Sequence, residues 1–181
     1  MPHLTISQFL SPTQLAGYAA FVLGITAFLQ RDDRRLKLFL ILECAVYVVH
    51  FVLLGNLPAA SSAGVSAVRN LLSLRYRSWR LAIVAMATSL ALGFLLVRSP
   101  VGWLPVVGSC LGTWGLFMMK GIPMRLLVLV STILWLVNNI ISGSIGGVLL
   151  ETFIALASIS TMLRIAIGSR RTSRRLEEPG S

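Results

Sequence analysis

The chain has 181 residues, of which 56% are hydrophobic and 12% charged, and its formal net charge is +10. A mean hydropathy of +0.83 excludes an ordinary soluble domain and predicts an integral membrane protein. The basic residues form short clusters between apolar segments, so we expect them to contact water and the anionic headgroups of the lipid bilayer, and we expect no nucleic-acid partner.

Seven apolar segments are long enough to cross a bilayer as helices, which takes about 20 residues each. In chain order they are residues 13–30, 36–55, 58–75, 80–97, 103–119, 123–142 and 145–167. The first segment is not preceded by a basic stretch and is not followed by a small-residue cleavage site, so we expect it to be retained. The third is rich in Ala and Ser and carries Arg69, so hydropathy alone could miss it.

The placement of charge supports the third span and orients the chain. Fourteen of the 16 basic residues fall on one side of the membrane only if seven spans are counted, whereas a six-span chain would divide them. The opposite loops carry Arg98 alone. Because Lys and Arg are enriched in cytoplasmic loops, we expect the N-terminus outside and the C-terminus in the cytoplasm.

An offset of 88 residues aligns the two halves of the chain. The aligned pairs are Tyr47 with Trp135, His50 with Asn138, Gly55 with Gly143, Asn56 with Ser144, and Gly24 with Gly112. The match predicts an all-α membrane protein with two parallel three-helix repeats, residues 13–75 and 103–167, joined by a linker helix at 80–97. A chance match in a repetitive apolar sequence is the alternative. We expect residues 168–181 to form a disordered, basic cytoplasmic tail.

Polar residues recur on one face of four of the predicted helices. The stripes are Glu43, Tyr47 and His50; Ser62, Ser66, Arg69 and Ser73; Ser131, Trp135, Asn138 and Ser142; and Glu151 with Ser158. A charged side chain at the bilayer centre costs about 2.5 to 3.5 kcal/mol, so such residues should point inward and pair or line water. The stripes predict a polar cavity, with Glu43, Tyr47, His50, Arg69, Trp135, Asn138 and Glu151 as candidate substrate-binding residues.

Each stripe also has a purely structural interpretation. Small residues allow helices to pack closely, and an ion pair of Arg69 with Glu43 or Glu151 would clamp the bundle. Tyr47 and Trp135 would either stack on a flat ligand or anchor an interface, and His50 would serve as a hydrogen-bond partner. Of the adjacent amides, we expect Asn138 to face the cavity, because Asn139 is turned about 100° away from it and should bond a neighbouring helix.

The sequence shows no constellation typical of an enzyme or a metal site. Cys44 and Cys110 lie in apolar segments without Cys-x-x-Cys spacing, and the chain has two histidines, so we expect no disulfide framework, metal or cofactor. An intramembrane enzyme is the weakest hypothesis, because the one arrangement it could use is an acid–base pair of Glu151 with His50.

Several ordered motifs resemble the YgjV-type bacterial inner-membrane proteins. They are Gln30 to Lys37, His50 to Gly55, Leu104 to Gly108, Thr113 to Phe117 with Lys120 and Gly121, and Ser142 to Gly147 with Glu151. The resemblance implies a multi-pass protein of the inner membrane. That family is similar in turn to the SWEET, PQ-loop and PnuC-type transporters, which implies three helices, a linker helix and three helices. It also implies Trp135 with Asn138 or Asn139 as pocket residues, although this chain has no PQ dipeptide.

The leading hypothesis is a SWEET-like transporter or facilitator of a small polar solute, of the sugar, nucleoside or vitamin class. It would work by alternating access between the two three-helix bundles, and a homo-oligomer is left open. The alternative is a non-transporting membrane scaffold or sensor, in which Arg69 clamps the bundle and the basic tail binds lipid or a partner.

Overall fold

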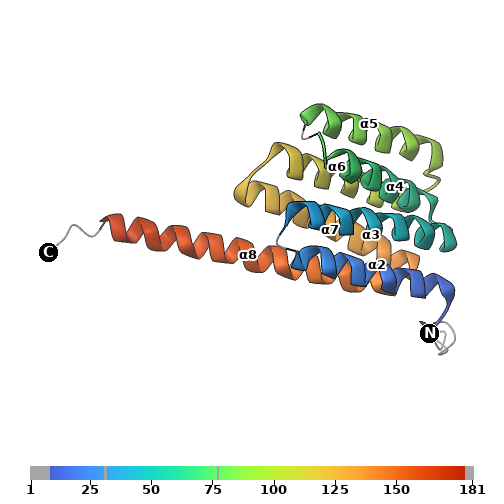
Figure 1. Cartoon of the computed structure of the whole chain (residues 1–181), viewed down its shortest axis with the longest axis horizontal. Helices are drawn as coiled ribbons and strands as arrows, with labels where there is room; N and C mark the ends of the chain where they lie inside the picture. Colours follow the sequence, from blue (N-terminus) through green and yellow to red (C-terminus); the bar gives the residue numbers. More distant parts are fainter. Residues whose placement is uncertain (1–8, 31, 77, 178–181) are drawn as a thin grey trace.

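The computed structural model describes residues 9–30, 32–76 and 78–177, shown in Figure 1. Across this part of the chain the elements are helical and no strand occurs. The elements are α2 (Pro12–Leu29), α3 (Asp33–Leu53), α4 (Leu57–Leu72), α5 (Trp79–Leu96), the short 3-10 helix η1 (Pro100–Gly102), α6 (Trp103–Met118), α7 (Gly121–Ser142) and α8 (Ile145–Glu177). The prediction of an all-α chain with seven long helices is therefore confirmed.

Side chains that cap the backbone explain where several helices begin. Ser11, Asp32 and Asn56 each accept a hydrogen bond from the backbone N–H three residues further along the chain. Proline follows closely at the starts of α2 and α4, where a missing N–H costs nothing because that group has no partner inside the helix. These caps place the helix starts within a few residues of the predicted spans.

The largest difference from the predicted bounds is at the end of α8. We predicted that the last span ends at residue 167 and that a disordered tail follows, whereas α8 continues to Glu177 and extends past the other helices in Figure 1. Residues 170–177 include four Arg, Leu176 and Glu177, all good helix formers, and extending a formed helix avoids the cost of nucleation. The remaining tail residues, 178–181, lie outside the described part.

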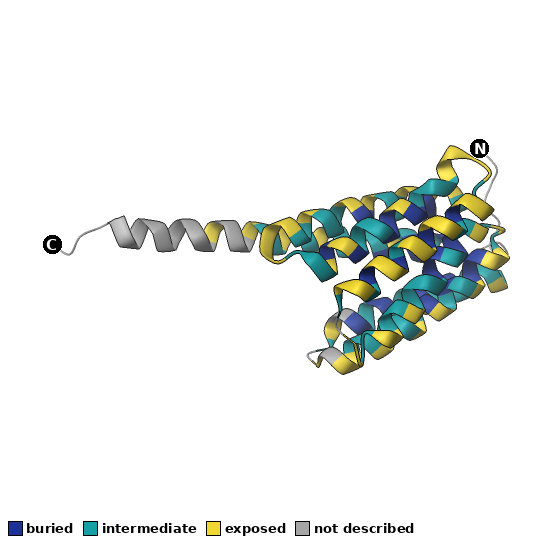
Figure 2. Cartoon of the chain, turned by 90° about the horizontal axis from the view of Figure 1, so that it is seen from above, coloured by how far each residue is buried: buried dark blue, intermediate teal, exposed yellow. Residues whose placement is uncertain are grey.

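In the described part of the chain, five helices are long and apolar enough to cross a membrane. The qualifying segments are Arg34–Leu53, Trp79–Leu96, Pro100–Met118, Gly121–Ser142 and Ile145–Leu163. The α2 and α4 helices are not among them, and α4 has 16 residues, so spanning by these two helices stays a prediction. Exposed residues follow the outward faces of the helices in Figure 2, and they include large apolar side chains such as Phe94, 77% exposed, as expected for contact with lipid.

The helices pack as a closed ring of six with one helix outside it. Along the ring α2 contacts α3, α3 contacts α4, α4 contacts α6, α6 contacts α7, α7 contacts α8, and α8 contacts α2 again. The α5 helix packs on the outer side against α4 and α6. Glycines permit the closest approach, because a Cβ at Gly146 of α8 would lie 2.2 Å from the backbone oxygen of Gly17 on α2.

The two ends of the ring differ in charge and in packing. We call the end with the loops at 30–32, 73–78 and 119–120 the basic end, because most basic residues lie there or on the continuation of α8. The opposite end contains the turns at 54–56 and 143–144, and we call it the clasp end for the hydrogen bonds described below. The largest fully buried side chains lie in the halves of their helices nearest the clasp end: Phe51, Leu150, His50, Val106, Asn138, Asn139, Pro105, Ser62 and Ser144.

Candidate functional site

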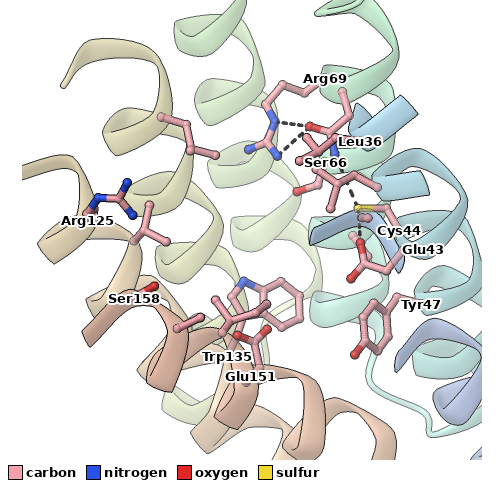
Figure 3. Close-up of a pocket in the computed structure, with 18 of the residues that line it drawn as sticks. Leu36, Glu43, Cys44, Tyr47, Ser66, Arg69, Arg125, Trp135, Glu151 and Ser158 are labelled. Carbon is pink, nitrogen blue, oxygen red and sulfur yellow. Dashed lines mark hydrogen bonds between the residues drawn. The ribbon is translucent and has the colours of Figure 1, made fainter. Parts of the chain in front are cut away.

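A cavity of about 520 Å³ lies inside the helix ring (Figure 3). Every helix of the ring contributes to its wall, from Ala27 on α2 to Thr161 on α8. The cavity reaches the basic end, where Leu36 and Arg125 line it near the starts of α3 and α7. The polar stripes of the sequence meet here, since Glu43, Tyr47, Ser66, Arg69, Trp135, Glu151 and Ser158 all line the same space.

Glu43 is held on the wall by a chain of hydrogen bonds. The Cys44 thiol donates to Glu43 Oε2 at 3.4 Å, and the Asn70 amide lies 3.9 Å from the Cys44 sulfur. Arg69 donates through Nε and Nη2 to the Asn70 side-chain oxygen, at 3.3 and 3.0 Å, as the dashed lines in Figure 3 show. Arg69 is therefore connected to Glu43 through two intermediate side chains rather than by a direct contact.

The predicted ion pair of Arg69 does not form. Besides Asn70, the guanidinium donates through Nη1 to the Thr113 hydroxyl on α6, which joins α4 to α6. Among the residues that the structure describes, no Lys or Arg lies within salt-bridge distance of Glu43 or Glu151. Both carboxyl groups thus face the cavity without a cationic partner from the described part of the chain.

Aromatic side chains end the cavity on the side of the clasp. Tyr47 stacks on Phe51 with a centroid separation of 5.3 Å, and Phe51 contacts Trp135 at 5.8 Å. Tyr47 and Trp135 line the cavity, whereas Phe51 is fully buried behind them. Tyr47 is 6% exposed, and its hydroxyl has no hydrogen-bond partner among the residues that the structure describes. A buried hydroxyl without a partner is costly, so this group is available to a molecule in the cavity.

His50 lies beyond these aromatic rings, in the clasp. Its Nδ1 is 2.7 Å from the carbonyl oxygen of Thr13, and its Nε2 is 2.7 Å from the Ser144 hydroxyl. Because a carbonyl oxygen only accepts, Nδ1 carries the proton, and in the neutral ring Nε2 accepts from Ser144. The Ser144 oxygen also accepts from the backbone N–H of Gly147 and so caps α8. Both ring nitrogens are therefore occupied.

The second part of the clasp centres on Asn56. Its Nδ2 donates to the Asn138 side-chain oxygen at 2.9 Å and to the Ser142 hydroxyl at 2.7 Å, while its Oδ1 caps α4 by accepting from Ala59. Asn139, also buried, packs against α8 so closely that a Cβ at Gly147 would lie 2.3 Å from Asn139 Oδ1. Within the described part of the chain, Asn138 Nδ2 and Asn139 Oδ1 have no hydrogen-bond partner.

Gln14 adds a third pair of hydrogen bonds at this end. Its Nε2 donates to the Gly143 carbonyl at 2.7 Å, and its Oε1 accepts from the backbone N–H of Ile145 at 3.2 Å. We define the clasp as the side chains of Gln14, His50, Asn56, Asn138, Ser142 and Ser144 together with the turns that they join.

The residues that the 88-residue offset aligned exchange contacts in the clasp. His50 bonds Ser144, while Asn138, the counterpart of His50, bonds Asn56, the counterpart of Ser144. The turns match as well, because Gly55 and Gly143 have φ angles of 72° and 71°, in the left-handed region that favours glycine. The bond from Asn56 N to Phe51 O has its counterpart between Ser144 N and Asn139 O. The structure thus carries the sequence repeat into a reciprocal set of contacts.

The structure divides the predicted site residues into two groups. Five of the seven line the cavity: Glu43, Tyr47, Arg69, Trp135 and Glu151. His50 and Asn138 do not line it, because both are buried in the clasp. Sequence reasoning missed Cys44, Asn70 and Arg125 as lining residues. Cys44 and Asn70 directly follow Glu43 and Arg69, which belong to the predicted polar stripes. Arg125 is one of the 14 basic residues that the sequence analysis assigned to one side of the membrane. Among the described residues no group of three or more His, Cys, Asp or Glu could hold a metal ion.

Comparison with known proteins gives two matches. The family model Imp-YgjV, described as a bacterial inner membrane protein, matches residues 12–168. The inner membrane protein YgjV of Escherichia coli (strain K12) is 45% identical over 139 residues, which cover 76% of this chain and 75% of that protein. No solved structure matches the chain.

Proposed function

The chain belongs to the YgjV family of bacterial inner membrane proteins, and on this premise we propose that it transports or facilitates the passage of a small polar solute. The sugar, nucleoside and vitamin classes are the candidates. The observation that carries the proposal is the cavity inside the ring, which reaches the basic end, is lined by acidic, basic and aromatic side chains, and ends at buried aromatic rings.

We infer that alternating access works between two three-helix units, α2 to α4 and α6 to α8, with α5 as the linker. The reciprocal contacts of His50 with Ser144 and of Asn56 with Asn138 support this division, because each bond joins one unit to the other. Parallel repeats with a site at their interface are an established transporter plan, which the SWEET-like proteins share. Opening toward the clasp end would require these bonds to break while contacts at the basic end close.

The charges of the loops support an orientation of the protein in the membrane. If the basic end faces the cytoplasm, the N-terminus lies outside and the cavity communicates with the cytoplasm in this conformation. The clasp then separates the cavity from the outer face of the membrane. A protease or a membrane-impermeant reagent applied to intact cells would report which end is outside.

The scaffold hypothesis depended on an ion pair that clamps the bundle. Arg69 instead donates to Asn70 and Thr113, and the acidic side chains that it would clamp face a cavity. Two unpaired carboxyl groups are a poor device for stabilising a membrane bundle, because each is costly at this depth. The same groups are useful where a solute must be held for a short time. The contacts therefore favour a transporter.

The first experiment measures uptake into proteoliposomes that contain the purified protein. Radiolabelled sugars, nucleosides and vitamins are supplied, and empty liposomes give the background. Ser158→Trp fills the cavity and should abolish any flux, whereas Ser160→Trp, on an exposed face of the same helix, should leave the flux unchanged. If no compound crosses above background, or if the Ser158→Trp protein still transports, the proposed function is wrong.

A second experiment tests movement at the clasp. Asn56→Cys and Ser142→Cys are combined in a Cys44→Ser, Cys110→Ser background, because the Asn56 amide nitrogen lies 2.7 Å from the Ser142 hydroxyl. A short, reducible thiol crosslinker should stop uptake, and reduction should restore it. Each single cysteine variant serves as the control. Full uptake by the crosslinked protein would contradict opening at this end.

A further inference from the structure

We propose that the group of the solute that the cavity recognises is a positively charged nitrogen, held by Glu43 and Glu151 against Tyr47 and Trp135. This inference rests on the proposed function and specifies the substrate class of the same site. The solute would then be a small organic amine or quaternary ammonium compound, or a zwitterion that carries such a group. Figure 3 shows that these four side chains gather at one end of the cavity, away from Arg125.

The first argument is the lack of compensation for the carboxyl groups. Glu43 accepts a hydrogen bond from the Cys44 thiol, a weak donor. Arg69, the basic residue that the sequence analysis paired with these acids, instead donates three hydrogen bonds to Asn70 and Thr113. An uncompensated carboxylate at this depth is strongly unfavourable, and a cation in the cavity would remove that penalty for both residues. A neutral solute would supply no counter-charge to either carboxylate.

The second argument is the aromatic wall beside the carboxyl groups. A cation near the face of Trp or Tyr is attracted by the ring quadrupole, and the attraction grows when the pair is removed from water. Tyr47 is almost fully buried, and its unpartnered hydroxyl, among the cavity-lining side chains, is free to accept from an ammonium N–H. Two acids beside two aromatic rings form the arrangement that recognises an organic cation.

The third argument separates an organic cation from a metal ion. A zinc site takes three or more protein ligands, and no such group of His, Cys, Asp or Glu exists among the described residues. The rest of the cavity wall is mostly apolar, with Leu40, Ile154 and Ala157 among its residues. A volume of about 520 Å³ accommodates an organic body together with its charged head.

Arg125 indicates how a zwitterion could fit. It lines the cavity at the basic end, and its buried Nε has no hydrogen-bond partner in residues 9–30, 32–76 and 78–177. A solute whose carboxylate and ammonium group are separated by several carbon atoms could place the carboxylate toward Arg125 and the ammonium group between the acidic residues. The shared requirement is the positive nitrogen, so probes with and without the carboxylate distinguish the two cases.

The test uses the full-length wild-type protein in detergent and measures binding by calorimetry. Two matched pairs compare a cation with a neutral compound of nearly the same shape: choline with 3,3-dimethyl-1-butanol, and benzylamine with benzyl alcohol. Glycine betaine is the zwitterionic probe. We expect at least one cation or the zwitterion to bind at least about tenfold more tightly than the neutral compounds, as for other buried charge-assisted contacts. Equal binding within both pairs, with no binding of glycine betaine, overturns the proposal.

Variants then assign the contacts. Glu43→Gln and Glu151→Gln should each weaken binding of the preferred probe by at least about tenfold, while Glu177→Gln at the end of α8, outside the cavity lining, should not change it. Trp135→Leu provides a second variant if a Gln variant does not fold. Arg125→Gln should leave the binding of choline unchanged, and it should weaken the binding of a zwitterion whose chain is long enough to reach Arg125. Unchanged affinity in folded Glu43→Gln and Glu151→Gln proteins would sink the assignment.

The two proposals fail in different ways. If the liposomes accumulate a neutral sugar or nucleoside while the cationic probes do not bind, the transport function stands and this inference is wrong. If a cation binds and the Gln variants lose it, but no solute ever crosses the membrane, the site is assigned correctly and the transport function is wrong.

Discussion

The clasp and the cavity inside the ring use polar residues in opposite ways. At the clasp end, His50 and Asn56 form hydrogen bonds with other residues of the chain, and the largest buried side chains lie in the same part of the bundle. Between the clasp and the basic end, Glu43 and Glu151 line the cavity and have no cationic partner in the described part of the chain. Glu43 and His50 are seven residues apart on one face of α3, yet one lines a cavity and the other is part of the packing.

The hydrogen bonds that join the two predicted units are concentrated at the clasp end. Between the two predicted units, five hydrogen bonds lie at the clasp end: two from Gln14, one from His50 and two from Asn56. Toward the basic end the described residues contribute the bond from Arg69 to Thr113. Substitutions at the clasp end should therefore reduce the free energy of unfolding, and substitutions on the cavity wall should affect solute handling more.

The largest effect is expected where α2 and α8 touch. Gly146→Ala would place a Cβ 2.2 Å from the Gly17 backbone oxygen, which cannot rotate away, so the helices must separate. We expect a loss of about 3 kcal/mol in the free energy of unfolding, measured by denaturant titration in detergent micelles. Gly64→Ala is the matched control, because its nearest neighbour would lie at an ordinary 3.7 Å. Equal losses would show that this contact does not limit the packing.

Truncation of the histidine should rank second. His50→Ala removes a fully buried ring and leaves the Thr13 carbonyl without its side-chain donor and the Ser144 hydroxyl without its acceptor. The expected loss is about 2 kcal/mol of unfolding free energy. Met124→Ala, which shortens a side chain on the cavity wall, should cost less than about 1 kcal/mol. A larger loss for Met124→Ala than for His50→Ala would reverse the comparison of the two ends.

The bond across the two units should give a measurable coupling. A double-mutant cycle with Asn56→Ala and Asn138→Ala should yield an interaction energy of about 1 kcal/mol, in the range of interhelical hydrogen bonds in membranes. We also expect Asn138→Ala to change the affinity of a cavity ligand less than Trp135→Leu does. Strictly additive losses of stability would mean that this bond contributes nothing to joining the units.

The smallest effect is expected on the cavity wall itself. Ser66 lines the cavity, and its side chain makes no hydrogen bond to another residue that the structure describes. Ser66→Ala should therefore change the unfolding free energy by less than about 0.5 kcal/mol. The thermal midpoint in detergent is a sufficient readout, with Ser62→Ala at a fully buried position nearer the clasp end as the comparison. A drop for Ser66→Ala as large as that for His50→Ala would contradict the interpretation of this wall.

The sequence predicted the lateral arrangement of the site better than its depth. Spacing of four and three residues placed Glu43, Tyr47 and His50 on one face of a helix, and that face does point into the ring. Periodicity around a helix axis contains no information on where along the axis a cavity ends. His50 and Asn138 were therefore grouped with the cavity residues, although the bundle is closed at their level.

The helices themselves could be predicted because apolar length and turn residues determine them. The end of α8 could not, because a polar, basic sequence is compatible with both a tail and a continued helix. The role of Cys44 was missed for a different reason. Its small apolar character fits a packing position, and only its neighbours Glu43 and Asn70 show that its thiol also joins a hydrogen-bonded chain on the cavity wall.

The reciprocal contacts of Asn56 and Ser144 change what can be expected of the two shortest loops. Loops usually tolerate inserted residues, because little depends on their register. Here Asn56 and Ser144 each cap the helix that follows them and also bond a residue of the opposite unit. The pattern is that of a two-fold interface, in which a contact between two positions occurs twice, once in each direction. One residue added to either turn would displace the capping bond and the bond to the opposite unit at once. These two loops should therefore be among the positions in the chain where length is least free to vary.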